Sequence, residues 1–180
     1  MKIILKNKYK PLIKSNSRYF IVSGGRASGK SYSISSFLLM LTFEKGHKIL
    51  FTRYTMSSAH ISIIPEFLQK IEFLNLTDHF EITKTSIINK LTGSQILFRG
   101  MRTSTGVQTA NLKSIEGITT WVLDEAEELI DESIFDKIDL SIRTKNNQNR
   151  VIVIMNPATK EHFIYRRFFQ DMGVQPGSNI

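Results

Sequence analysis

The order of apolar and polar residues along these 180 residues predicts an α/β fold with a mainly parallel central sheet and helices on both faces. Two observations support this class. Short runs rich in β-branched and aromatic residues alternate with longer segments of helical periodicity. A glycine-rich segment also joins the first such run to the first helical segment, as in a strand–loop–helix unit.

Each element follows from a local pattern. Four core strands are predicted, over residues 18–24, 47–53, 119–125 and 150–157. Three helices are predicted, over residues 30–43, 57–74 and 131–143, with a break or kink at Pro65. Turn signals at Thr85-Ser86 and Thr92-Gly93-Ser94 predict a β-rich insertion near 80–100, a hairpin or small meander. The last residues, 170–180, are expected to form a frayed tail or the start of a linker.

The composition is that of an ordinary soluble globular protein. The chain is 41% apolar and 22% charged, and its length suits one domain over residues 1–180. It has no cysteine, which excludes disulfides and thiolate metal sites. No run approaches the roughly 20 apolar residues that span a bilayer, so we expect an intracellular protein without membrane contact.

The formal charge of +8 is unevenly distributed. Eight of the sixteen acidic residues lie between Asp124 and Asp139, where Lys137 is the only basic residue, so that stretch carries −7 and the remainder +15. A basic surface with a local acidic cluster suits a polyanion-binding protein that also holds a cation. A solvated basic face explains the charge equally well.

The strongest motif is Gly24-Gly25-Arg26-Ala27-Ser28-Gly29-Lys30-Ser31, which fits G-x-x-x-x-G-K-[ST] between a predicted strand and a predicted helix. Inward-pointing amides and the helix N-terminus would bind the phosphates of a nucleotide. Lys30 would neutralise β- and γ-phosphate oxygens, and the Ser31 hydroxyl would ligate Mg²⁺. These eight residues and Tyr32 are the predicted nucleotide contacts. The alternative, a chance glycine-rich turn, does not explain the strand and helix that flank the motif.

A second motif, "TWVLDEAEEL" (120–129), ends an apolar strand in two acids. Asp124 is predicted to hold Mg²⁺ through a water, and Glu125 to orient and deprotonate the attacking water. For Glu127 and Glu128 an acidic helix cap and a solvated face is the favoured interpretation. The Asp-Glu pair favours ATP hydrolysis that drives motion over a small GTPase or a nucleoside kinase.

A third, weaker signal is Asn156-Pro157 at the end of the strand "VIVIM". If this strand flanks the phosphate loop, the Asn156 side chain could contact the γ-phosphate or the attacking water. A turn that starts at Asn-Pro is the alternative.

With these residues placed, the chain resembles the ATPase domain of bacteriophage terminase large subunits, the motors that drive DNA into procapsids. The resemblance covers about residues 18–170 and includes "GGRASGKS", "ILFRGM", "LKSIEGITTWVLDEAEEL" and "RVIVIMNPATKEHFIYRRFF". It implies a RecA-like fold of the additional-strand, catalytic-glutamate type, with ATP and Mg²⁺ as cofactors. It also implies nucleotide contacts from Lys30 and Ser31, Mg²⁺ binding by Asp124, catalysis by Glu125 and a coupling role for Asn156.

Two family features do not carry over. Many members have a glutamine upstream of the first strand that reads adenine, whereas this chain has none before Gln69, so Tyr9, Arg18 or backbone groups are expected to hold the base. The nuclease domain of the family is not expected within these 180 residues, and DNA cleavage is not predicted. Arg26 would contact phosphate or move on hydrolysis, its alternative being a solvated arginine.

The resemblance also implies partners and a location. Expected partners are double-stranded DNA bound without sequence preference, further copies of the chain in a ring during packaging, the portal of the procapsid and the terminase small subunit. The expected location is the cytoplasm of an infected or prophage-carrying bacterium. Candidates for an arginine finger acting between copies are Arg102, Lys113 and Arg143. Candidates for DNA contact are Arg53, Lys84, Lys90, Arg99 and Arg102.

Two other functions stay open at this point. The first is a helicase-like or recombination ATPase, which shares the Asp-Glu chemistry. The second is a nucleotide-binding switch that does not hydrolyse ATP, against which Glu125 argues.

Overall fold

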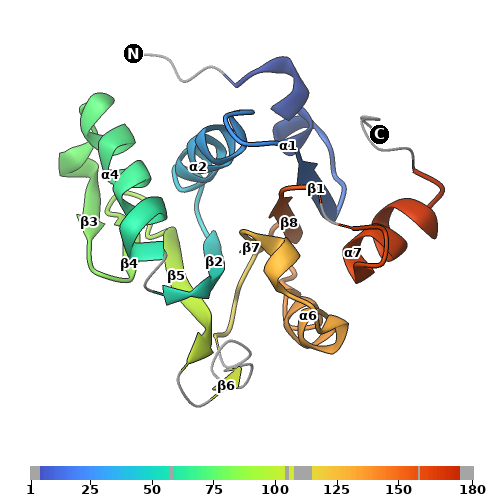
Figure 1. Cartoon of the computed structure of the whole chain (residues 1–180). Helices are drawn as coiled ribbons and strands as arrows, with labels where there is room; N and C mark the ends of the chain where they lie inside the picture. Colours follow the sequence, from blue (N-terminus) through green and yellow to red (C-terminus); the bar gives the residue numbers. More distant parts are fainter. Residues whose placement is uncertain (1–4, 57–58, 104–105, 108–114, 158, 175–180) are drawn as a thin grey trace.

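The computed structural model describes residues 5–56, 59–103, 106–107, 115–157 and 159–174. Its strands form one sheet in the order β1-β8-β7-β2-β5-β4-β3, with β6 beside β5 (Figure 1). The strands are β1 (Tyr19–Ser23), β2 (Lys48–Thr55), β3 (Phe80–Ile82), β4 (Ser86–Asn89), β5 (Gln95–Thr103), β6 (Gly106–Val107), β7 (Thr120–Leu123) and β8 (Arg150–Met155). Pairing is parallel from β1 through β5 and antiparallel beyond, which confirms the mainly parallel sheet.

Helices cover both faces of the sheet, as predicted (Figure 1). On one face, α1 (Pro11–Lys14), α2 (Lys30–Leu41) and α4 (Ile64–Phe73) pack on alternate strand residues such as Phe51 and Ile152. On the other, α6 (Glu132–Asp139) and α7 (Phe163–Tyr165) pack against Trp121. Short helical turns complete the chain: η1 (Asn7–Tyr9), η2 (Ala59–Ile63), η3 (Thr77–His79), η4 (Ala126–Glu128) and η5 (Arg166–Gln170). None of the described helices is long and apolar enough to cross a membrane.

Strand order and register bring the carboxyl ends of three parallel strands, β1, β8 and β7, together at one end of the sheet. β8 lies between β1 and β7 and is parallel to both, which is the additional strand that the family resemblance implies. Ser23 at the end of β1 pairs with Met155 at the end of β8, and Leu123 at the end of β7 pairs with Val153. The segments that follow these strands therefore leave the sheet side by side. These segments contain the predicted site residues.

The helix predicted over 57–74 is interrupted next to Pro65, as predicted. A π-helical turn, η2, precedes α4, which begins at Ile64, because Pro65 has no N–H to continue an α-helix and fits its first turn. The β-rich region is a meander, β3-β4-β5, as predicted, but β5 also pairs in parallel with β2 and so belongs to the main sheet. The proposed tail falls partly on residues 175–180, which lie outside the described residues.

The glycine of the "ILFRGM" segment, Gly100, is required by a close approach of two backbones. A Cβ at this position would lie 2.6 Å from the backbone nitrogen of Met56. Real side chains do not approach a backbone so closely, so only glycine lets β5 lie against the end of β2, where Arg53 pairs with Gly100.

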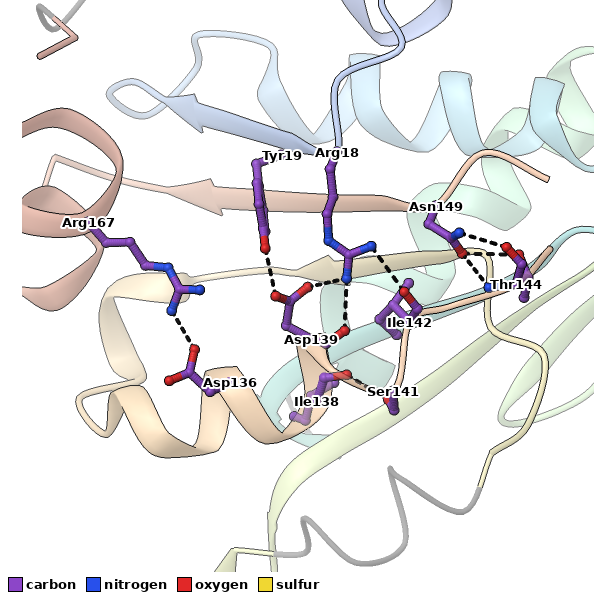
Figure 2. A network of polar contacts seen from close by, with 10 residues as sticks. All are labelled: Arg18, Tyr19, Asp136, Ile138, Asp139, Ser141, Ile142, Thr144, Asn149 and Arg167. Atoms are coloured by element: carbon purple, nitrogen blue, oxygen red, sulfur yellow. Dashed lines mark hydrogen bonds and ion pairs between the residues drawn. The ribbon is translucent and has the colours of Figure 1, made fainter. Parts of the chain in front are cut away.

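A polar network fastens the start of β1 to the end of α6 (Figure 2). The buried Asp139 carboxylate accepts hydrogen bonds from Arg18 Nη2 at 2.6 Å and from the Tyr19 hydroxyl at 2.7 Å. Arg18 also donates to the carbonyls of Asp139 and Ile142. In the same view, Arg167 pairs with Asp136, whose side chain is 47% exposed.

We predict that Asp139→Ala lowers the free energy of unfolding by about 2 kcal/mol, because it leaves the Arg18 and Tyr19 donors without their acceptor. Asp136→Ala is the matched control and should cost less than about 1 kcal/mol, since its ion pair is half exposed. Urea unfolding of both variants measures the difference. Equal losses would contradict the buried role of Asp139.

Candidate nucleotide-binding site

The glycine-rich loop folds as its sequence predicts, between β1 and α2. Gly29 has a φ of +83° and Ala27 one of +60°, so the chain turns tightly before α2 begins at Lys30. The Gly24 N–H donates to the Met155 carbonyl at 3.3 Å, which ties the loop to β8. The Lys30 ammonium curls back to contact the Gly24 carbonyl, the Gly25 carbonyl at 3.0 Å and Asn156 Oδ1 at 3.4 Å.

One open cavity of about 530 Å³ brings together the predicted site residues. Its lining includes Gly25, Arg26, Ala27, Ser28, Gly29, Lys30, Ser31, Tyr32, Asp124, Glu125 and Asn156. Gly24 is absent from the lining, and its role is to join the loop to β8. Four further residues with polar side chains line the cavity without having been predicted there: Arg53, Ser62, Glu66 and Glu127.

Asp124 is buried and carries a large desolvation cost. Burial raises the pKa of its carboxyl from 3.8 to about 6, although the nearby Arg53 pulls the pKa down. The carboxylates of Glu127 and Glu66 raise it further. A buried carboxylate with two further carboxylates nearby is a suitable site for a cation.

The residues near Asp124 fit Mg²⁺. Ser31, Glu66 and Asp124 also line a second, small cavity of about 10 Å³, close to the least volume that holds a water. Hydroxyl and carboxylate oxygens are the hard donors that Mg²⁺ prefers. Among the described residues no group of three acids or histidines forms a metal cage.

Glu125 is held by Arg53. Its own φ of +52° turns the chain sharply after β7, so that its side chain reaches the cavity. Arg53 Nε donates to Glu125 Oε2 at 2.8 Å and Nη2 contacts Oε1, while Nε lies 3.7 Å from Asp124 Oδ2. The Arg53 side chain is only 12% exposed. The expectation that Arg53 lies on a DNA-binding edge is therefore wrong, since its guanidinium is committed to the acids of the cavity.

Glu127 binds Asn156, against the expectation of a solvated acid. Its Oε1 accepts from Asn156 Nδ2 at 2.7 Å, and its Oε2 accepts from the Asn156 backbone N–H at 3.2 Å. Glu128 is exposed, as expected. Asn156 lies at the end of β8, the strand beside the phosphate loop, which is where the sequence predicted it.

The helix that follows β2 contributes a polar face that sequence reasoning missed. Ser62 contacts Arg53, and Glu66 accepts from Ser35 at 2.8 Å and from Lys70 at 2.8 Å. The Lys70 ammonium lies 4.2 Å from the centre of the Tyr32 ring, and burial lowers its pKa. The sequence does contain a pattern that indicates this face. Ser62, Glu66 and Lys70 are spaced four residues apart, which places them on one side of a helix.

Arg18, one of the two expected base-reading residues, does not face the loop. It is bound to Asp139 at the opposite end of β1, and five strand residues, about 17 Å, separate it from the loop. The expectation for Arg18 is therefore wrong. Tyr9 is 5% exposed and packs in the core, and its neighbour Lys8 donates to the Ser28 carbonyl of the loop at 3.2 Å, so a contact between Tyr9 and the base stays a prediction.

Arg26 is exposed and lines the cavity, whereas Lys84, Lys90, Arg99 and Arg143 are not among its lining residues. Lys84, Lys90 and Arg143 are exposed, and Arg99 donates to the carbonyls of Thr85 and Phe98. The side chain of Arg102 and the whole of Lys113 lie outside the described residues.

We predict that Asp124→Asn stabilises the protein at neutral pH when nucleotide and Mg²⁺ are absent. Because the folded state raises the Asp124 pKa from 3.8 to about 6, it binds the proton more tightly than the unfolded chain, and stability falls as pH rises between these values. The asparagine avoids this loss of up to about 3 kcal/mol. In urea unfolding, Asp124→Asn should have a higher free energy of unfolding than wild type at neutral pH, and this difference should vanish near about pH 4. A variant less stable than wild type at neutral pH would contradict the cost of burying Asp124.

Comparison with solved structures finds a similar fold in three phage proteins. The HK97 bacteriophage large terminase matches with a TM-score of 0.74 at 15% identity, over 96% of this chain and 37% of that one. The Thermus phage P74-26 large terminase ATPase domain matches with a TM-score of 0.65 at 18% identity, over 98% and 73%. The N-terminal domain of the DNA packaging ATPase from bacteriophage phi29 matches with a TM-score of 0.66 at 16% identity, over 93% and 85%. The chain thus spans well under half the length of the HK97 protein.

No curated protein sequence matches the chain significantly. The phage terminase large subunit family, in contrast, matches residues 16–178, which is nearly the whole sequence and contains the phosphate loop, the Asp124-Glu125 pair and Asn156. The chain belongs to the phage terminase large subunit family.

Proposed function

We propose that the chain hydrolyses ATP to ADP and phosphate with Mg²⁺. The observation that carries the proposal is the cavity in which Lys30, at the start of α2, meets Asp124 and Glu125, which follow β7. Two of the matched structures are a terminase ATPase domain and a DNA packaging ATPase, which supports the same activity.

In this proposal the loop amides and the N-terminus of α2 bind the phosphates, and Lys30 exchanges the carbonyls of Gly24 and Gly25 for phosphate oxygens. Ser31 and Asp124 would hold Mg²⁺, which supplies charge neutralisation at the phosphates when bound. Burial of Asp124 separates its carboxylate from bulk solvent.

Glu125 would accept the proton of the attacking water. A carboxylate whose two oxygens are bound by a guanidinium is a weak base, because the positive charge stabilises its ionised form. Arg53 must therefore release at least one Glu125 oxygen before proton transfer. The bond between Arg53 and Ser62 gives the guanidinium a second partner on the helix side of the cavity.

We predict that Lys30→Ala abolishes nucleotide binding, because the loop loses its only lysine within the cavity lining. Glu125→Gln should still bind ATP but lose phosphate release by on the order of 10² or more, since an amide cannot take the proton. Calorimetry with a non-hydrolysable ATP analogue and a phosphate-release assay separate the two effects. Undiminished turnover in Glu125→Gln would refute the role of Glu125.

We further propose that hydrolysis moves double-stranded viral DNA into a procapsid, in a ring of such chains at the portal and with the terminase small subunit, inside the infected or prophage-carrying cell. Family membership and the charge of +15 outside the acidic stretch support this. A helicase-like ATPase shares the cavity, and DNA-stimulated strand separation would favour it. Absence of phosphate release would favour a nucleotide switch.

We predict that duplex DNA binding by this chain is independent of sequence and falls on the order of 10³-fold between about 50 and 200 mM salt, because cationic side chains displace condensed counterions. Fluorescence anisotropy on two duplexes of unrelated sequence measures both properties. Binding that survives high salt, or that prefers one duplex, would contradict a backbone-gripping motor.

A further inference from the structure

The orientation of the Asn156 amide depends on Glu127. The two oxygens of the Glu127 carboxylate take the two N–H donors of one residue, the backbone N–H at 3.2 Å and the side-chain Nδ2 at 2.7 Å. With Nδ2 bound there, the other end of the amide faces the cavity, and Oδ1 lies 3.4 Å from the Lys30 ammonium. We infer that Glu127 is a positioning residue, which makes Asn156 present a hydrogen-bond acceptor to the reacting groups.

The backbone after β7 fixes Glu127 in this place. Glu125, whose backbone is left-handed, precedes the turn η4, and Ala126, the first residue of that turn, is completely buried. Glu127 is half-buried and lines the same cavity as Asp124 and Glu125. Asp124 and Glu125 thus share Arg53 as their partner, whereas Glu127 binds the residue at the end of β8.

An acceptor at Oδ1 limits what Asn156 can bind. The oxygens of a bound triphosphate are themselves acceptors, so Oδ1 cannot bond to them directly. Among the described residues, the Lys30 ammonium contacts Oδ1 at 3.4 Å, and a water bound in the cavity would be a second donor. Asn156 would therefore orient the attacking water once Lys30 turns to the phosphates, and it would not read the γ-phosphate itself. This inference rests on the proposed ATP hydrolysis.

The test begins with Glu127→Gln. The glutamine amide has one acceptor oxygen and directs its own donors at Asn156, so the Asn156 amide is expected to rotate and turn Nδ2 towards Lys30. We expect kcat to fall on the order of 10²-fold while the affinity for a non-hydrolysable ATP analogue and the melting temperature stay near wild type. Glu128→Gln, with the same change of charge on the next, exposed residue, should behave as wild type.

A charge exchange separates positioning from a general structural role. In Glu127→Gln with Asn156→Asp, the glutamine donates to the new carboxylate and accepts from the backbone N–H, and an acceptor again faces Lys30. The double variant should recover much of the rate that either single variant loses. A double variant no faster than the single variants, or Glu127→Gln equal to Glu128→Gln in kcat, would overturn the inference.

Nuclear magnetic resonance tests the contact without turnover. The side-chain amide signal of Asn156, assigned by its loss in Asn156→Asp, should shift in Glu127→Gln and stay in place in Glu128→Gln. An unmoved signal in Glu127→Gln would overturn the inference by itself. If the wild-type protein releases no phosphate from ATP, the proposed hydrolysis is refuted. The Asn156 amide signal would still show whether Glu127 contacts Asn156.

Discussion

The ion pair between Arg53 and the acids that follow β7 is the interaction on which the rest of the cavity depends. Glu66, Asp124, Glu125 and Glu127 all line one cavity, and Asp124 is largely buried. Carboxylates that line one cavity repel one another unless positive charge lies among them. Arg53, 12% exposed, supplies positive charge to Asp124 and Glu125, and Lys30 supplies it on the loop side.

The pairing of parallel strands brings these charges together. Arg53 reaches the acids because β2 lies beside β7 in register, with Thr52 opposite Leu123, one residue before each charged group. Asn156 reaches the loop because β8 lies between β1 and β7. Gly100 allows β5 to support this end of β2, since any side chain there would collide with Met56. Strand order thus decides the partners of each acid.

The sequence alone predicts the elements and the residues whose roles depend on local pattern. The phosphate loop, the apolar strand before Asp124 and the strand before Asn156 are all where they were expected, because spacing and periodicity are local properties. Arg53, Glu127 and Glu66 were missed or misjudged because their roles come from side-chain pairs between strands and helices far apart in sequence. The expectation that Arg18 reads the base failed because β1 places Arg18 far from the loop, next to Asp139.

The most direct test of this account is an experimental structure of the chain with Mg²⁺ and a non-hydrolysable ATP analogue. The account predicts that Lys30 contacts phosphate oxygens, that Ser31 and Asp124 lie at the metal, and that at least one Glu125 oxygen has left Arg53. Glu127 should still hold Asn156, with Oδ1 towards the water or Lys30. A nucleotide bound outside this cavity, or a positioned water with Glu125 still bound at both oxygens by Arg53, would contradict it.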